Sequence, residues 1–473
     1  MEITYITPRV CRKLILIFLG WGVDARAFSG LRKPGYDIVC IHGYGSLGAA
    51  GCWDRLALLG REYEEVVVVA WSFGVRAAAD FMTSAAQSIP LTRRIAVNGT
   101  PAHIDDSLGI PEAIFAGTLA NLDERNIRKF RRRMFSSASD FAAFDSAAPL
   151  TRSVESLRDE LRLFGSLPPQ AGGVKLFDHA IVGGRDAIFP PDNQMRCWEG
   201  SDVEFISEMP HFPDFENIID RLVIDKELVA ERFAASASTY TGNAPVQTQV
   251  AEQLWMLARL YAAPAVGDLG GGILEIGVGN GLLTRHYAPL VNANRLMLWD
   301  IAPINADNIP QGATVSRCDA EVAIRGLADC SLSMLLSAST IQWFNNPASF
   351  VRCACQKLMS GGVMALSSFG PMNFKEIRAA AGTGLHYPDL QALAQAAKEE
   401  GCRVMVAREE TIVQTFRSAA DMLRHLSLTG VNAISRGKGN ATAARRLMES
   451  ARGGAEGKAE LTYNPIYLVA VKD

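Results

Sequence analysis

A serine lies between an apolar run and an amphipathic segment in VVVVAWSFGVRAA, residues 66–78. The apolar run predicts a buried strand and the following residues predict a helix, so Ser72 falls in a sharp turn between them. Turns with the pattern G-x-S-x-G present a serine hydroxyl above a sheet, where it can attack an ester carbonyl. Gly74 keeps the second glycine, and Ala70 replaces the first at the cost of one methyl group. The alternative is that Ser72 merely caps the helix.

A nucleophilic serine needs a base and an orienting carboxylate, which on such a sheet follow in the order Ser, Asp, His. Asp186 and His211 each come just after a predicted strand, in that order. We expect His211 to take and return the proton of Ser72, and Asp186 to fix the imidazole. The backbone N–H groups of Trp21 and Phe73 are expected to stabilise the oxyanion. The alternative is that His211 is an ordinary loop histidine.

Two other histidines compete for the role of base. His103 follows the strand after the turn that carries Ser72, which we call the elbow, but it precedes Asp186 in the chain. His42 lies in HGYG, which looks like an oxyanion motif but follows the wrong strand, so it is a second choice. The oxyanion donor should come from the loop two strands before the elbow, and GWG (20–22) lies there.

Four short segments make the assignment more specific: FLGWG (18–22), AWSFG (70–74), NGTP (98–101) and PHFP (210–213). Together they resemble BioG-type pimeloyl-[acyl-carrier protein] methyl ester esterases over about the first 220 residues. The resemblance implies that this part of the chain removes the methyl group of a carrier-bound ester.

A glycine-rich turn ends a later predicted strand in ILEIGVGNG, residues 273–281. Glu275, Gly277, Gly279 and Gly281 give the pattern E-x-G-x-G-x-G. Glycine lets a cofactor approach the backbone closely, and the acidic residue offers a hydrogen-bond acceptor. A nicotinamide cofactor uses a related turn, so the pattern alone does not identify the ligand. A turn that binds nothing is the remaining alternative.

Acidic residues near later strand ends narrow the choice of cofactor. Asp300 ends the next predicted strand, where it can accept both hydroxyls of a ribose. Asp319 and Ala320, after the following segment, suit the edge of an adenine. This set resembles a class I S-adenosylmethionine-dependent methyltransferase more than a dehydrogenase, and that resemblance implies S-adenosylmethionine as the cofactor.

The same half of the chain, about 225–473, also resembles malonyl-[acyl-carrier protein] O-methyltransferases of the BioC type. The segments that carry this resemblance are ERFAASASTYTGNAPVQ (231–247), TIQWFNN (340–346) and LSLTGVNA (426–433). Ala338 stands where an asparagine is common in that family, and Thr429 stands where a lysine is common. Tyr240 and Trp343 are candidates for lining the acceptor pocket, with core packing as the alternative role.

These residues require two α/β sheets to hold them. Apolar runs at 14–19, 36–41, 66–71, 94–97, 179–184 and 203–206 alternate with helical spacing and predict a parallel sheet. Residues 105–175 lack strand character and predict a helical lid. A second series follows, with predicted helices at 226–240 and 247–261. Its first predicted strand ends at the glycine-rich turn, and the others are at 295–300, 332–339, 361–369 and 467–473. We expect an α/β-hydrolase domain over 1–222 and a class I methyltransferase domain over 223–473.

Composition excludes several classes of protein. The chain has 473 residues, of which 48% are hydrophobic and 21% charged, and its net charge of −3 gives no overall attraction to nucleic acid. Nine cysteines without metal-ligand spacing favour reduced thiols in the cytoplasm. The run at 14–19 imitates a signal peptide, but it flows into GWG, so we expect a buried first strand. No run reaches the ~20 apolar residues that span a membrane.

The two resemblances together imply a bifunctional enzyme of biotin synthesis that acts on malonyl and pimeloyl groups of an acyl-carrier protein. Because such a carrier is acidic, the cationic run RNIRKFRRR (125–133) on the expected lid is a candidate docking surface, with Arg128, Arg132 and Arg133 as substrate-binding candidates. A solvated helix face is the alternative. The N-terminal domain could also dock carrier protein without catalysis, or the pair could serve secondary metabolism. The sequence leaves the oligomeric state open.

Overall fold

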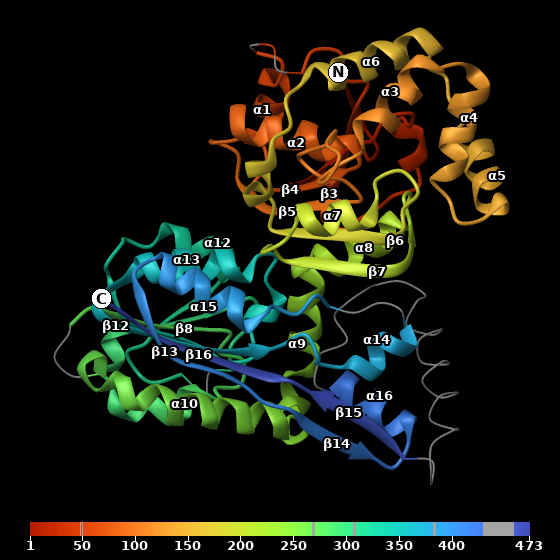
Figure 1. Ribbon diagram of the computed structural model, residues 1–473. Coiled ribbons are helices and arrows are strands. Elements are labelled where there is room, and N and C mark those ends of the chain that lie inside the picture. Colours follow the sequence, from red (N-terminus) through yellow and green to blue (C-terminus); the bar gives the residue numbers. More distant parts are fainter. Residues whose placement is uncertain (48, 50, 267–269, 306–308, 382–384, 429–457) are drawn as a thin grey trace. The chain divides into compact units, whose positions relative to one another are not determined.

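The computed structural model describes residues 1–473 apart from 48, 50, 267–269, 306–308, 382–384 and 429–457 (Figure 1). Contacts divide the chain into two compact units, Met1–Ile219 and Asp220–Asp473. Among the described helices, none is both long and apolar enough to cross a membrane.

The N-terminal unit is built on a seven-stranded sheet in the order β1-β3-β2-β4-β5-β6-β7. The sheet is parallel except for β1, which pairs antiparallel with β3. Its strands are β1 (Glu2–Tyr5), β2 (Lys13–Phe18), β3 (Tyr36–His42), β4 (Glu65–Trp71), β5 (Leu91–Val97), β6 (His179–Arg185) and β7 (Val203–Pro210). The central strand β4 is buried along its whole length, and strands covered on both faces are continuous apolar runs.

Helices α1 (Asp54–Arg61), α2 (Phe73–Ser84), α7 (Pro191–Cys197) and α8 (Phe215–Leu222) accompany this sheet. Helix α2 packs on β2 and β4, and α7 packs on β6. The helix after the elbow is therefore held against the centre of the sheet, where a residue at its start meets the ends of several strands.

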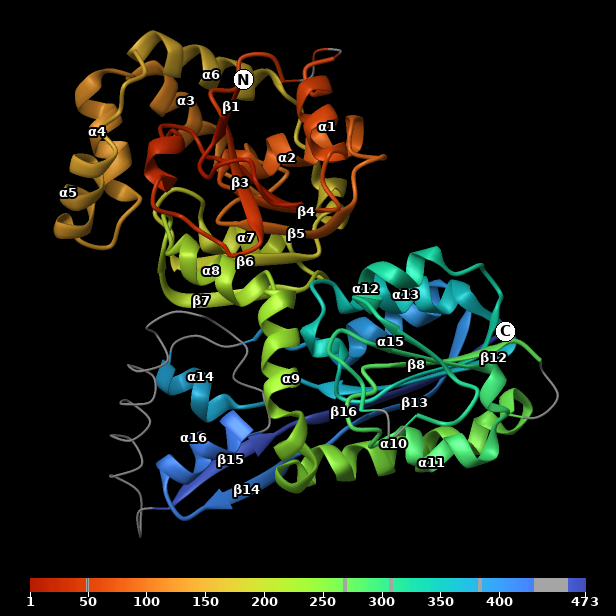
Figure 2. The ribbon, with the colours of Figure 1, turned by 180° about the vertical axis from the view of Figure 1, so that it is seen from behind.

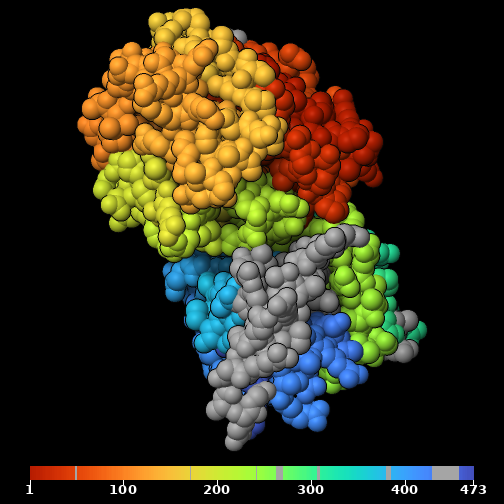
Figure 3. Space-filling view, turned by 90° about the vertical axis from the view of Figure 1, so that its right-hand side faces the viewer, coloured from red at the N-terminus to blue at the C-terminus, as the bar shows by residue number. Residues whose placement is uncertain are grey.

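Four further helices lie between β5 and β6, and we call them the helical insertion: α3 (Glu112–Ala120), α4 (Glu124–Arg133), α5 (Ala138–Ala147) and α6 (Val154–Ser166). They form one group outside the sheet (Figures 1 and 2) and a continuous part of the surface of this unit (Figure 3). Asp123, Ser137 and Ser153 each accept a hydrogen bond from the backbone N–H three residues later and so cap α4, α5 and α6.

The C-terminal unit has a second seven-stranded sheet, in the order β10-β9-β8-β11-β12-β16-β13. Its strands are β8 (Gly272–Ile276), β9 (Leu296–Asp300), β10 (Thr314–Arg317), β11 (Leu332–Ser337), β12 (Leu358–Phe369), β13 (Cys402–Glu409) and β16 (Pro465–Lys472). Only β16 runs antiparallel to its neighbours, β12 and β13. In chain order the first five strands are arranged 3-2-1-4-5, the order of a doubly wound fold, and the switch point between β8 and β11 is where such folds bind ligands.

Helices cover both faces of this sheet (Figure 1). On one face α10 (Pro245–Val266) packs on β11, β12 and β16, and on the other α15 (Leu390–Glu399) packs on β13 and β16 and against α13 (Pro347–Lys357). Successive strand residues alternate between the two cores, with Ile273 on the α10 side and Leu274 on the α13 and α15 side. The remaining elements are α9 (Lys226–Asn243), the short helices α11 (Thr284–Tyr287) and α12 (Ala320–Ala323), and a two-stranded sheet of β14 (Ile412–Phe416) and β15 (Ala459–Tyr463) with α14 (Lys375–Ala381) and α16 (Ala419–Leu428).

The two-domain α/β fold expected from the sequence is confirmed, with differences at the sheet edges. The run at 14–19 forms the second strand, because the short strand β1 precedes it. The segment LSLTGVNA is described only as far as residue 428, in α16, so Thr429 lies outside the described residues.

Candidate active sites

Ser72 occupies a strained turn at the end of β4. Its backbone lies at φ 59° and ψ −130°, a left-handed conformation that non-glycine residues rarely adopt. The side chain makes no capping hydrogen bond to α2, all of whose residues are described, so the capping alternative is not what the structure has. Gly74 is required by close packing, since a Cβ there would lie 2.1 Å from the carbonyl oxygen of Phe18.

His211 and Asp186 meet Ser72 in one buried chain of hydrogen bonds. Ser72 Oγ lies 3.1 Å from His211 Nε2, and His211 Nδ1 donates to Asp186 Oδ2 at 2.9 Å. The carboxylate of Asp186 also accepts from the backbone N–H groups of Ile188 and Phe189, at 2.8 and 2.9 Å. The carboxylate of Asp186 is thereby oriented before any substrate arrives.

Three side chains that the sequence did not single out hold this arrangement. The carbonyl oxygen of His211 accepts from Trp71 Nε1 at 2.8 Å and from Asn98 Nδ2 at 2.9 Å. Gln194 Nε2 donates to Asp186 Oδ2 at 3.0 Å. Asn98 follows β5 with a positive φ of 46°, and NGTP was the only local signal for it.

Both rival histidines are bonded elsewhere. His103 Nε2 lies 2.9 Å from the carbonyl oxygen of Phe164, and burial lowers the pKa of His103 to about 4. His42 Nε2 lies 3.0 Å from Thr4 Oγ1, and burial lowers its pKa as well. Of the three candidate bases, His211 is therefore the one placed against Ser72.

A hollow of about 430 Å³, partly open to solvent, lies beside Ser72. Trp21 and Phe73, the expected oxyanion donors, both line it. The Trp21 indole donates to the carbonyl oxygen of Leu157 at 2.9 Å, and its ring meets Phe130 edge-on at 4.7 Å, so this side chain is tied to α6 and α4. The other lining side chains are mostly apolar: Ile110, Ile114, Phe115, Thr118, Leu161 and Ile188, together with Arg133.

The cationic run of α4 is not uniformly exposed. Arg128 is exposed and lies 3.4 Å from Asp145, whereas Arg131 is buried and donates to Asp145 at 2.5 Å and to the carbonyl oxygen of Ala148 at 2.7 Å. Arg132 donates to the carbonyl oxygen of Phe135, and Arg133 donates to that of Ala187. The expectation that Arg131 belongs to an exposed docking surface is wrong, because its charge is paired inside the helical insertion.

The second site begins at the glycine-rich turn after β8. Gly277, Gly279 and Gly281 all have positive φ, at 72°, 51° and 69°. A Cβ at Gly277 would lie 1.9 Å from Thr340 Oγ1, whereas a Cβ at Gly279 would meet no atom within 4 Å. Gly279 thus borders open space in which a ligand can approach the backbone.

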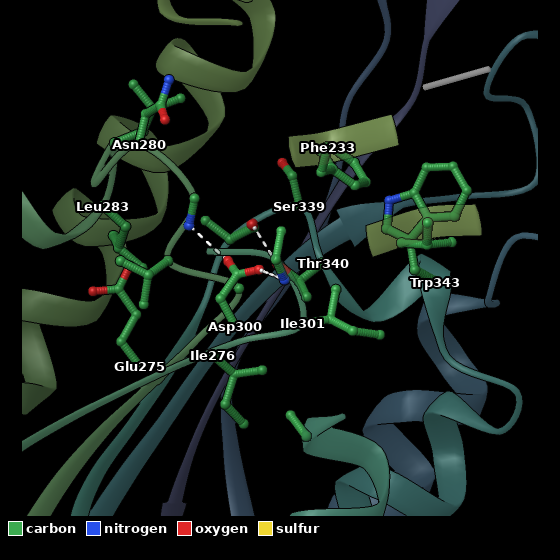
Figure 4. Close-up of a pocket in the computed structure, with 18 of the residues that line it drawn as sticks. Phe233, Glu275, Ile276, Asn280, Leu283, Asp300, Ile301, Ser339, Thr340 and Trp343 are labelled. Atoms are coloured by element: carbon green, nitrogen blue, oxygen red, sulfur yellow. Dashed lines mark hydrogen bonds between the residues drawn. The ribbon is translucent and has the colours of Figure 1, made fainter. Parts of the chain in front are cut away.

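Asp300, at the end of β9, is held by backbone donors of two loops (Figure 4). Its Oδ2 accepts from the N–H of Gly279 at 2.8 Å, and its Oδ1 accepts from the N–H of Ala302 at 2.7 Å. Burial raises the pKa of Asp300. Each carboxylate oxygen keeps a lone pair for a further donor, which suits the two hydroxyls of a ribose.

Glu275 lines the same cavity. Its Oε2 accepts from Thr284 Oγ1 at 2.7 Å and from the hydroxyl of Tyr287. Burial raises the pKa of Glu275 to about 7. The carboxyl group therefore also orders the start of α11.

The cavity has about 1050 Å³ of space, including a part open to solvent, and it collects the other residues expected there: Tyr240, Asp319, Ala320, Ala338 and Trp343. Asp319 caps α12 and lies 3.3 Å from the ammonium group of Lys226. Lys226, which the sequence did not single out, is buried and also pairs with Glu321 at 2.9 Å. The space is of the size that small-molecule ligands occupy.

Three polar atoms on lining residues have no hydrogen-bond partner among the described residues: Trp343 Nε1, Gln247 Oε1 and Ser339 Oγ. Figure 4 shows Ser339, Phe233 and Trp343 to one side of Asp300 and Asn280, Leu283 and Glu275 to the other. Buried polar atoms are normally satisfied, so these three are available to a bound molecule. These three polar atoms, the open backbone at Gly279 and the carboxylate of Asp300 fit an adenosyl cofactor with a methyl acceptor beside it.

Comparison with known proteins gives two matches to protein families. Residues 1–216 match the family described as pimeloyl-ACP methyl esterase BioG, and residues 274–366 match a methyltransferase domain. A malonyl-[acyl-carrier protein] O-methyltransferase of Bacteroides fragilis is 33% identical over 98% of this chain and 94% of its own length. The chain belongs to the malonyl-[acyl-carrier protein] O-methyltransferase family.

Two other matches each cover about half of this chain. The malonyl-[acyl-carrier protein] O-methyltransferase of Porphyromonas gingivalis is 33% identical, and the match covers 52% of this chain and 96% of the relative. The crystal structure of BioG from Haemophilus influenzae is 31% identical and covers 45% of this chain and 94% of its own, with a TM-score of 0.39. In this 473-residue chain, the methyl donor of the C-terminal unit is S-adenosylmethionine.

Proposed function

We propose that this chain is a bifunctional enzyme of biotin synthesis. Its C-terminal unit methylates the free carboxylate of malonyl-carrier protein, and its N-terminal unit hydrolyses the methyl ester of pimeloyl-carrier protein. The observation that carries the proposal is the presence of two separate sites, the Ser72–His211–Asp186 chain in one unit and the cavity around Asp300 in the other. The B. fragilis relative, which spans nearly the whole chain, supports it.

In the hydrolase site Ser72 Oγ attacks the ester carbonyl carbon while His211 Nε2 takes its proton. The backbone N–H groups of Trp21 and Phe73 stabilise the oxyanion, and collapse expels methanol with the proton returned by His211. Water, activated by the same imidazole, then releases the carboxylic acid and restores Ser72. Asp186 holds the imidazole in the tautomer that both steps need.

In the methyltransferase site Asp300 binds the ribose hydroxyls, and the turn around Gly279 accepts the cofactor against the backbone. Asp319 and Ala320 bind the adenine edge. When bound, S-adenosylmethionine supplies an electrophilic methyl group. The acceptor carboxylate, with an ordinary pKa near 4 or below, is already ionised, so the chain needs no general base.

The acceptor side of the cavity is formed by Tyr240, Phe233 and Trp343, which exclude water. Trp343 Nε1 is a donor only, and its lack of a partner among the described residues suits an oxygen of the acceptor. Ser339 and Gln247 add two groups able to orient that acceptor. By shielding the acceptor carboxylate from water and fixing its orientation, these residues would lower the cost of reorganisation in methyl transfer.

Two variants test the proposal. Ser72→Ala should abolish hydrolysis of pimeloyl-carrier-protein methyl ester and leave methylation of malonyl-carrier protein unchanged. Asp300→Ala should do the reverse, by weakening cofactor binding. Mass spectrometry of the carrier protein measures both reactions as the loss or gain of one methyl group. Hydrolysis that survives Ser72→Ala, or cofactor affinity that survives Asp300→Ala, would reject the corresponding site.

A further inference from the structure

Asp186 and His211 of the hydrolase site lie on two different loops, after β6 and after β7. Both loops contact the C-terminal end of α4. Arg133, the last residue of α4, donates a guanidinium N–H to the carbonyl oxygen of Ala187, the residue that follows Asp186. The next residue, Met134, accepts a hydrogen bond from the N–H of Phe212, the residue that follows His211, at 2.9 Å. Two consecutive residues of the helical insertion thus bind the neighbours of both triad partners.

Packing strengthens the contact on the histidine side. Met134 is fully buried, and the ring of Phe212 lies 5.2 Å from that of Phe135 and 4.9 Å from that of Phe144. The guanidinium of Arg131 lies over Phe144 at 5.1 Å and pairs with Asp145. The end of α4 and the second half of α5 therefore form one packed unit around the residue after His211.

The contacts made by β4, by the residue after β5 and by α7 do not replace those made by α4. Trp71 and Asn98 hold the carbonyl oxygen of His211, and Gln194 holds the carboxylate of Asp186. The N–H of Phe212 and the carbonyl oxygen of Ala187 are bonded instead to α4. Each loop is consequently fixed from both sides, and the end of α4 bonds to the residue that follows each triad partner.

We propose that the end of α4 is a positioning element of the hydrolase and that Arg133 is a positioning residue for the triad. Arg133 aligns the Asp186 loop relative to the His211 loop, which Met134 holds one residue further along. This role rests on the proposed esterase function of Ser72. It differs from a role in docking carrier protein, because it acts on every ester, including those without a carrier.

The role is tested with a small neutral ester, p-nitrophenyl butyrate, which cannot use a carrier-docking surface. In the full chain, Arg133→Gln should lower kcat at least fivefold and leave KM within twofold. It should also slow the phosphonylation of Ser72 by a fluorophosphonate probe by a similar factor, since that reaction needs His211 aligned on Ser72. Arg133→Lys, which keeps a cationic donor, should retain more of both rates than Arg133→Gln.

The matched control is Arg162→Gln, the same change of charge in the same helical insertion. Arg162 lies on α6, is exposed, and pairs with Glu155 and Asp159. This variant should keep the kcat and the labelling rate of the wild type, and equal melting temperatures for all variants establish that the fold is intact. Unchanged kcat and labelling in Arg133→Gln would overturn the positioning role, as would a lysine variant slower than the glutamine variant. A wild-type protein that is not labelled at Ser72 would instead reject the proposed esterase function.

Discussion

The indole N–H of Trp71 donates to the carbonyl oxygen of His211 at 2.8 Å, so the residue before the candidate nucleophile holds the histidine that faces it. The two rings also lie close, with centroids 5.2 Å apart. A single position of β4 thereby fixes both the strand that ends in the elbow and the loop that carries the base. The elbow and the base are positioned together.

Trp71→Phe should lower the kcat for ester hydrolysis severalfold and destabilise the N-terminal unit by about 1 kcal/mol, the usual contribution of one hydrogen bond. Phenylalanine keeps most of the packing, but it leaves the carbonyl oxygen of His211 with Asn98 as its side-chain donor. Trp53→Phe is the control, because Trp53 donates its indole N–H to Asp80 at 2.8 Å, away from the triad. Equal losses of kcat in the two variants would mean that the Trp71 bond has no special relation to His211.

In the proposed function, the esterase must spare the short ester that the methyltransferase of the same chain makes. Pimeloyl exceeds malonyl by four methylenes, and burying each contributes about 0.8 kcal/mol, or roughly 3 kcal/mol in all. The hollow beside Ser72 offers apolar side chains for this purpose, among them Ile110, Ile114 and Phe115. We expect kcat/KM to rise at least tenfold from malonyl to pimeloyl methyl ester on the same carrier protein. Comparable values for the two esters would contradict the pathway proposed here.

The exposed cations of α4 should affect carrier-bound esters selectively. Reversing Arg128 and Lys129 to glutamate should raise KM for pimeloyl-carrier-protein methyl ester severalfold, and more at low salt, because screening weakens attraction between exposed charges. A small methyl ester should be hydrolysed as before. An equal loss on both esters would indicate damage to the helical insertion rather than to docking.

Glu275 gives the C-terminal unit a defined pH dependence. Its pKa is about 7 in the fold and 4.5 as a free side chain, so the folded state prefers the neutral carboxyl. Stability from this preference is complete below pH 4.5 and is lost as pH rises to 7, by about 3 kcal/mol in total. Without cofactor, the melting temperature of the wild type should therefore fall by several degrees relative to Glu275→Gln between pH 5 and pH 8. A difference that stays constant over this range would disprove the assignment.

Buried parallel strands were the part of the fold that the sequence predicted best. They are continuous apolar runs, so the segments at 66–71 and 295–300 match β4 and β9 within a residue at each end. The strands β1 and β10 went unpredicted, because EITY and TVSR are short edge strands with few apolar residues. An edge strand buries only part of its surface, and its pairing partner is set by the fold rather than by its own pattern.

In the candidate site, too, some residues could be predicted from the sequence and others could not. Ser72, Asp186 and His211 follow a known chain order, so the sequence could nominate all three. The burial of Arg131 and Lys226 could not be predicted from the sequence, because their partners Asp145 and Asp319 lie 14 and 93 residues away. Local patterns carry no information about pairs at that separation. Trp71 and Gln194 escaped notice for a similar reason, since their role is to hold catalytic candidates on other loops.

The backbone of Ser72 carries an energetic cost that bears on the role of its hydroxyl. A non-glycine residue in such a conformation costs the fold about 1–3 kcal/mol, and glycine would remove that cost. The hydroxyl of Ser72 does not stabilise α2, because it makes no capping hydrogen bond to that helix. In a unit that served only as a passive adaptor, glycine at this position would give the more stable fold. The strained serine is therefore a net cost to the fold of this unit unless its hydroxyl acts outside α2, as it does in the proposed nucleophilic role.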